Sequence, residues 1–125
     1  MITARQNDIL SLIAASIFAD NRVFAAEVDA FIKSTKQLNT LNGMTPKFTE
    51  AGLLAWYEAH KDDIRQKIST PYFKDWYYNL LEKLSDLKGK ETLLDIMYKI
   101  SLADGSIHVD ERALITLAKR YWNIK

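Results

Sequence analysis

Apolar positions recur along most of this chain every three or four residues, which is the period of a helix that buries one face. They predict a first helix over about residues 3–19 and a second that begins near Ala25. The second should end at Asn42 and Gly43, because both residue types tolerate the left-handed conformation of a helix C-terminus. No segment alternates with period two, and only two prolines and four glycines interrupt the chain. The pattern therefore indicates an all-α protein.

The middle of the chain, about residues 46–87, predicts two helices rich in aromatic residues. Thr49 is a suitable N-cap for the first of them, which should extend to Ile68. Thr70 and Pro71 then have the residue types of an N-cap and a first helical position. On this next helix we expect one buried face, formed by Tyr72, Phe73, Trp76, Tyr77, Leu80, Leu81 and Leu84. Tyr78 falls off that face and indicates an exposed interaction surface.

Two more helices are predicted after Gly89, over about residues 91–103 and 109–122. We therefore expect a compact bundle of six helices, or of seven if the third helix breaks near His60.

The two ends of the chain repeat one pattern, since residues 9–37 align without a gap with residues 93–121. Each copy is an apolar helix, a tight acidic turn and a second amphipathic helix. The two turns read Phe18-Ala19-Asp20-Asn21-Arg22-Val23 and Leu102-Ala103-Asp104-Gly105-Ser106-Ile107. The repeat predicts two helical hairpins related by a pseudo-twofold axis within a single domain of residues 1–125.

Both turns place a carboxylate where a helix disfavours it. Asp20 and Asp104 follow the carboxyl end of a helix, whose free carbonyls oppose a negative charge by roughly 0.3 to 1 kcal/mol. The compensating partner is either a backbone N–H within the turn or a cation. Glu27 and Glu111 follow, and each could instead form half of a capping box. If symmetry brings the turns together, these four acids and Asp110 would supply hard oxygen ligands for one divalent cation, Ca²⁺, Mg²⁺ or Mn²⁺.

The turn at Asp104, together with Glu111, also matches the second half of an EF-hand calcium loop. In that register Ile100 and Leu102 would occupy the first and third ligand positions, where neither side chain can coordinate calcium. In the first copy the third position falls on Phe18. A pair of EF-hands is therefore excluded.

A longer signature in the second copy points to a family. It is the run Leu102-Ala103-Asp104-Gly105-Ser106-Ile107-His108-Val109-Asp110-Glu111, followed by Leu114, Ile115 and Ala118. This run resembles the signature hairpin of the TerB-like tellurite-resistance family, and the domain is also similar to the amino-terminal region of certain membrane-anchored J-domain co-chaperones. The resemblance implies a helical fold over nearly the whole chain and cation binding by the acids, most directly Asp104 and Glu111. The first copy departs from it at Asn21 and Ala26, where the family has a glycine and an acid.

Composition narrows the classes of function. The absence of cysteine excludes disulfides and thiolate metal sites and suits a reducing compartment, so we expect a cytoplasmic protein. Seventeen basic and sixteen acidic side chains leave a formal charge of +1, which gives no general attraction for nucleic acid. The longest apolar stretch, residues 9–19, is shorter than the roughly 20 residues of a membrane span. We therefore expect neither a nucleic-acid partner nor a membrane span.

Catalytic motifs are missing from the sequence. It contains no glycine-rich phosphate loop and no nucleophile elbow. His60 and Asp63 have the spacing of two ligands on one helix face, but no further His or Cys completes a zinc set, and a solvated His60 is the simpler interpretation. His108, within the acidic turn, could titrate near neutral pH or ligate a soft metal, or could be a surface residue.

Together with the resemblance, these observations predict a non-enzymatic, cytoplasmic stress-response domain of bacterial tellurite-resistance type. We expect it to bind a divalent cation weakly and to act through a protein partner. The alternative is a pure protein-interaction or immunity-type module in which the acids only shape the turns. An enzyme would need a pocket lined by Asp104, Glu111, His108 and a tyrosine without a core function.

Overall fold

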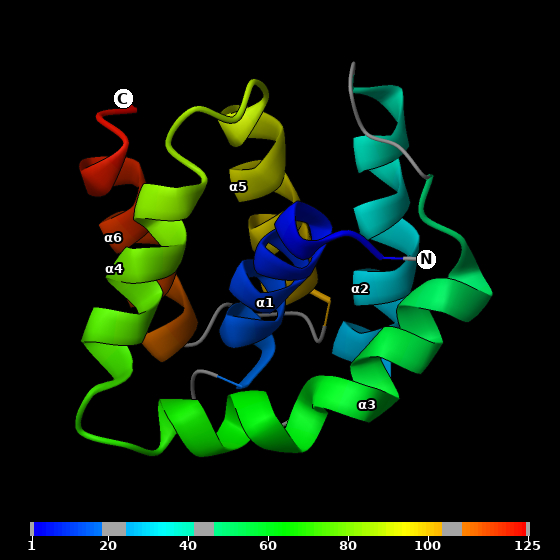
Figure 1. Ribbon diagram of the computed structural model, residues 1–125, viewed down its shortest axis with the longest axis horizontal. Coiled ribbons are helices and arrows are strands. Elements are labelled where there is room, and N and C mark those ends of the chain that lie inside the picture. The colour runs from blue at the N-terminus through cyan, green and yellow to red at the C-terminus, as the bar shows by residue number, and fades with distance from the viewer. Residues whose placement is uncertain (1, 19–24, 42–46, 104–108, 125) are drawn as a thin grey trace.

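The computed structural model describes residues 2–18, 25–41, 47–103 and 109–124. These residues form α-helices joined by turns, with one 3-10 helix and no strand, which confirms the all-α prediction (Figure 1). The elements in chain order are α1 (Ala4–Phe18), α2 (Ala25–Thr35), η1 (Lys36–Thr40), α3 (Glu50–Ile68), α4 (Phe73–Lys83), α5 (Lys90–Ser101) and α6 (Val109–Tyr121).

Helix α1 is the centre of the bundle. Every side chain from Ile9 to Phe18 is buried, because this segment is apolar or small on all sides, and a helix that is apolar all round must be covered all round. It contacts each of the other five α-helices. In Figure 1, α4 and α6 lie on one side of α1, α2 lies on the other, and α3 crosses below them.

The two copies of the repeat contact each other reciprocally. Helices α1 and α5 are in contact, and each of them also contacts both α2 and α6. Two hairpins related by a pseudo-twofold axis require this pattern.

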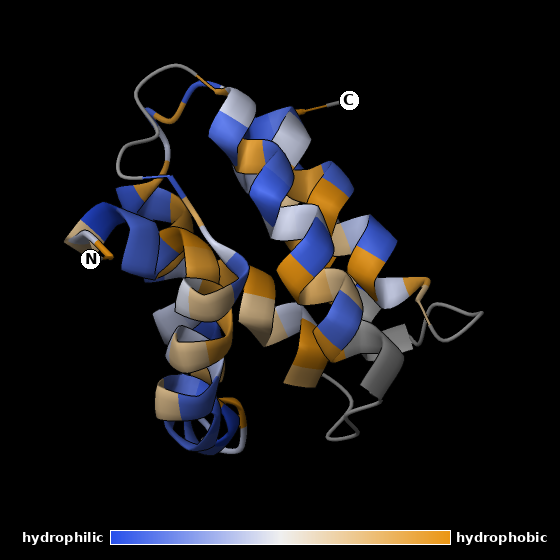
Figure 2. Cartoon of the chain, turned by 90° about the vertical axis from the view of Figure 1, so that its right-hand side faces the viewer, coloured by the Kyte–Doolittle hydropathy of each residue, from blue (hydrophilic) through white to orange (hydrophobic). Residues whose placement is uncertain are grey.

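Most helices in Figure 2 carry both hydrophilic and hydrophobic residues along their length, as amphipathic helices that bury one face do.

Helix α3 begins where the sequence predicts. The Thr49 hydroxyl accepts the backbone N–H of Gly52 at 3.0 Å, so Thr49 is the expected N-cap. The helix continues without a break through His60 to Ile68, which gives six α-helices among the described residues rather than seven.

Helix α2 ends earlier than predicted. It stops at Thr35, and the chain tightens into the 3-10 helix η1, whereas Asn42 and Gly43 lie outside the described residues. Within η1, Leu38 enters the core. The Asn39 side chain donates to the carbonyl of Phe48 at 2.9 Å and accepts its N–H at 2.7 Å, and these bonds fix the approach to α3.

The predicted start of α4 is wrong. The Thr70 hydroxyl donates to the carbonyl of Lys67 at 2.8 Å, so it completes the end of α3 instead of capping the next helix. Helix α4 then begins at Phe73, and Tyr72 before it is 72% exposed rather than buried. Tyr78, predicted to be exposed, is half-buried and packs against the Tyr121 ring at a centroid distance of 5.7 Å.

Gly89 separates α4 from α5 as expected. Its φ of 94° lies in the left-handed region, and a Cβ there would stand 2.8 Å from a methyl carbon of Leu41. Both the conformation and the close approach therefore require glycine.

No helix in the described part of the chain is both long and apolar enough to cross a membrane.

Candidate functional site

The five acids predicted to bind a cation belong to the two hairpins. Glu27 lies in the first turn of α2, and Asp110 and Glu111 lie in the first turn of α6. Asp20 and Asp104 lie outside the described residues, as do the side chains of the other three acids. Among the described residues, no group of three His, Cys, Asp or Glu side chains could hold a metal ion. The composite cation site therefore stays a prediction.

The four helix ends that adjoin the acidic turns lie toward one end of the bundle. In Figure 1, α1 and α5 run downward and α2 and α6 run upward. The carboxyl ends of the first pair and the amino ends of the second pair are thus all on the side that α3 crosses. The fold therefore brings the four helix ends that adjoin the acidic turns to the same end of the molecule.

The carboxyl end of α1 is anchored on α3. The Phe18 ring stacks on Tyr57 with centroids 6.0 Å apart, and the Arg65 guanidinium lies 5.2 Å from the Phe18 centroid, where the ring face attracts a cation. The aligned residue at the end of α5 is Leu102, which is 40% exposed. The two ends that precede the acidic turns are therefore unequal.

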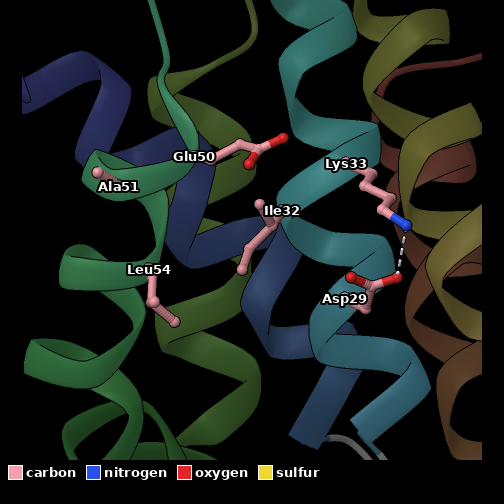
Figure 3. Close-up of a pocket in the computed structure, with 6 residues that line it drawn as sticks. All are labelled: Asp29, Ile32, Lys33, Glu50, Ala51 and Leu54. Carbon is pink, nitrogen blue, oxygen red and sulfur yellow. Dashed lines mark ion pairs between the residues drawn. The ribbon is translucent and has the colours of Figure 1, made fainter.

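A first groove, of about 230 Å³, lies between α2 and α3 (Figure 3). Ile32 and Leu54 come from facing helices and form its apolar part, while the charged side chains stand around them. Lys33 Nζ lies 3.1 Å from Asp29 Oδ2, and Glu50 Oε1 lies 3.2 Å from the Nζ of Lys36. Every charged residue that lines this groove is therefore paired.

A second groove, of about 280 Å³, lies between α4 and α6 and is more apolar. Its buried floor is Tyr77 and Leu114, which are 1% and 4% exposed. The Tyr77 hydroxyl donates to the Leu114 carbonyl at 2.8 Å, and burial raises the pKa of this phenol, so it remains a donor. The lining residues are Ile68, Phe73, Lys74, Tyr77, Ala113, Leu114 and Leu117.

Long aromatic side chains connect α4 to the end of the chain. The indole N–H of Trp122 donates to the Leu81 carbonyl at 3.0 Å, and the Tyr121 hydroxyl donates to the Glu82 carboxylate. Together with the bond from Tyr77, these contacts join α4 to α6 and the residue after it near the middle and at the carboxyl ends of the two helices. The groove is thus built on buried polar contacts as well as on apolar packing.

His60 lies in a third cavity, of about 440 Å³, near the start of α3. Its Nδ1 is 2.9 Å from the Trp56 carbonyl, so Nδ1 carries the proton in the neutral ring, and the imidazole stacks on the Trp56 indole at 4.7 Å. His60 is half-buried, because Trp56 covers one ring face, so the imidazole is partly rather than fully solvated. Asp63 pairs with Lys67 at 3.5 Å, so the ion pair of Asp63 is with Lys67 and not with His60.

Sequence reasoning missed both helix-lined grooves. Periodicity places a residue on a buried or an exposed face, but it does not report the separation of two neighbouring helices. One signal was present in the repeat: the α6 residues that align with Asp29 and Lys33 are Ala113 and Leu117, which are apolar.

Comparison with known proteins settles the family. The family model described as tellurite resistance protein TerB matches residues 6–125, which include both hairpins and the middle helices. No curated protein and no solved structure gives a match. The match agrees with the all-helical fold and with the hairpin signature around Asp104. The chain therefore belongs to the TerB family of tellurite resistance proteins.

Proposed function

We propose that this TerB-family domain is a non-enzymatic stress-response module that binds a divalent cation weakly at its acidic hairpin turns and acts through a protein partner. One observation carries the cation part: the four helix ends that adjoin the two turns lie toward the same end of the bundle. Such an arrangement supports ligands drawn from both copies of the repeat.

Electrostatics supports a cation at this position. Glu27, Asp110 and Glu111 occupy first helical turns, where the helix dipole favours negative charge. Asp20 and Asp104 follow helix carboxyl ends, where the dipole opposes it. A hard cation such as Ca²⁺, Mg²⁺ or Mn²⁺ would relieve that opposition and prefers carboxylate oxygens as ligands.

The shifted pKa values among the described residues support a role without catalysis. Glu58 raises the pKa of Lys61, Arg5 lowers that of Asp86, and a hydrogen bond to Glu82 raises that of Tyr121. Each of these three shifts comes chiefly from a surface contact with one partner, and the fourth, the raised pKa of Tyr77, comes from burial of a phenol that bonds to a backbone carbonyl. An active site instead concentrates such shifts in a cleft, beside a nucleophile or a general base.

Isothermal titration calorimetry of the wild type and Asp104→Ala with Ca²⁺, Mg²⁺, Mn²⁺ and Zn²⁺ tests the cation. We expect binding heat from at least one of the three hard cations, a higher melting temperature in its presence, and at least about tenfold weaker binding by Asp104→Ala. Glu91→Gln is the matched control, because this exposed carboxylate lies in the first turn of α5, away from the acidic turns. It should bind the cation as the wild type does.

Equal heats and equal melting temperatures for the wild type and Asp104→Ala would remove the cation from the proposal. The remaining function would be the protein-interaction or immunity-type module in which the acids only shape turns. The stress role has its own test, the survival on tellurite of a sensitive bacterial host that expresses the wild type or Asp104→Ala. The stress role would be contradicted if the hosts that express the wild type and Asp104→Ala survived no better than a host that carries the empty vector.

A further inference from the structure

The α2–α3 and α4–α6 grooves have walls on equivalent helices of the repeat, α2 and α6, but these walls differ in chemistry. On α2 the groove wall is the ion pair of Asp29 and Lys33, and the aligned wall on α6 is Ala113 and Leu117. Ala113 is exposed and Leu117 is half-buried. The first hairpin folds with Asp29 and Lys33 at these two positions. Apolar residues at the aligned positions of α6 are therefore not required for a hairpin to fold.

One cation lines the apolar groove, and two more lie along α6. Lys74 lines it from α4, and Arg120 follows Leu117 by three residues, which places it on the same face of α6. Arg112 stands beside Ala113. All three cations are exposed, and none has an ion pair with another described residue. Asp110 precedes this row, and its side chain lies outside the described residues.

The length of the groove suits a helix of a protein partner. Its volume of about 280 Å³ is at the lower end of the roughly 300–1,000 Å³ of small-molecule sites. The wall continues along α6 from Ala113 through Leu117 to Arg120, or about two helical turns. A helix that lies in a groove presents apolar anchors over that length, at every third or fourth position.

We propose that the α4–α6 groove docks an amphipathic helix of a partner protein, which places an apolar anchor over Tyr77 and acidic side chains opposite Lys74 and Arg120. This inference rests on the partner-binding part of the proposed function and assigns it a surface. These cations, which have no ion pair with another described residue, favour an acidic partner, because complementary charge increases the association rate and discriminates against basic helices.

The repeat itself supplies the test variant. Ala113→Asp/Leu117→Lys copies the α2 ion pair into α6 and should keep the fold, because the first hairpin carries the same residues in the aligned positions. The probe is a phage-displayed library of helical peptides of about four turns, selected on the wild-type protein. We expect enriched peptides with apolar residues at helical spacing and flanking Asp or Glu. Their affinity, measured by fluorescence anisotropy, should fall at least about tenfold for the variant.

Two further variants separate fold from charge. Asp29→Ala/Lys33→Leu makes the reverse change on α2 and should leave the affinity of the selected peptides for the α4–α6 groove within about twofold. Lys74→Glu/Arg120→Glu keeps the apolar floor, and it should weaken acidic peptides and reverse the salt dependence of their binding, because salt then screens a repulsion. Circular dichroism melting confirms that each variant is folded.

Several results would overturn the inference. They are an enrichment of basic or uncharged peptides, the absence of any enrichment, or equal peptide affinity for the wild type and Ala113→Asp/Leu117→Lys. Binding to phosphatidylglycerol vesicles that the variant abolishes would assign the groove to a membrane surface. A wild-type dimer that the variant dissociates would assign it to a second copy of the chain.

The two proposals can fail separately. Peptide titrations are run in chelator without cation, and cation titrations are run without peptide. Loss of peptide binding with retained cation heat removes only the groove, whereas loss of cation heat with retained peptide binding removes only the metal site.

Discussion

Helices α1 and α5 come from aligned segments of the repeat, yet α1 is buried on all sides and α5 exposes a polar face. Ala14 and Ala15 of α1 align with Tyr98 and Lys99 of α5. Tyr98 is 48% exposed, and Lys99 pairs with Asp95 at 3.1 Å on the surface. Helices α3 and α4 pack against α1 and supply the additional cover. A repeat without gaps therefore produces an unequal pair of helices when the segment between the copies covers only one of them.

The largest test of this difference exchanges one residue between the helices. Ala15→Lys places the lysine of α5 at a position of α1 that is 0% exposed. An unpaired buried ammonium is strongly unfavourable, so we expect a loss above about 4 kcal/mol in the free energy of unfolding. Urea denaturation followed by circular dichroism measures it.

Two controls separate volume from charge in that experiment. Ala15→Met adds a chain of similar length without a charge and should cost about 1–3 kcal/mol through overpacking. Lys99→Ala, the reverse exchange, removes the exposed pair with Asp95 and a long, exposed hydrogen bond to Gln37, and it should change stability by less than about 0.5 kcal/mol. An equal loss for Ala15→Lys and Lys99→Ala would contradict the unequal burial of the two helices.

The second test compares the helix ends that precede the acidic turns. Phe18→Ala removes a ring that is 1% exposed and contacts Tyr57 and Arg65, so we expect a loss of about 3–5 kcal/mol. Leu102→Ala, at the aligned position, removes a side chain that is 40% exposed. It should cost less than about 1 kcal/mol.

Thermal melting of both variants, each with and without the cation, gives the result. Similar losses for the two variants would mean that the end of α5 is as well packed as the end of α1. The comparison also bears on the proposed site, because the turn with the complete family signature follows the less buried of the two ends.

Much of the fold was predictable because its signals are local. The N-cap at Thr49 and the break between helices at Gly89 depend on residues within one turn, and the structure confirms both. The start of α4 was predicted wrongly because the Thr70 hydroxyl can either cap the next helix or bond to the end of the preceding one. It donates to the carbonyl of Lys67, at the end of α3. Tyr72 was then assigned to the wrong face, because a residue before the first turn does not follow the period of the helix.

Tertiary features of the candidate site were less predictable. The acids of the turns follow from the repeat, but their convergence depends on side-chain geometry that the described residues do not include. The two grooves depend on how far apart α2 and α3, or α4 and α6, are held, and long-range contacts such as that of Tyr77 with Leu114 set this distance. What the sequence does contain is the contrast between Asp29 and Ala113, which becomes informative once the fold places both residues on groove walls.

The smallest expected effect concerns the ends of α2 and α6. Thr35 is 0% exposed at the end of α2, and its hydroxyl has no hydrogen-bond partner among the described residues, whereas the aligned Lys119 is exposed. Thr35→Val keeps the branched shape and removes the unpaired hydroxyl, so we expect a gain of about 1 kcal/mol in the free energy of unfolding. Thr40→Val is the control, because the exposed Thr40 hydroxyl donates to Gln37 at 2.8 Å, and a small loss is expected. Chemical denaturation of both variants decides the matter: a loss of stability on Thr35→Val would mean that this hydroxyl is hydrogen-bonded in the folded protein and would contradict the unpaired end of α2.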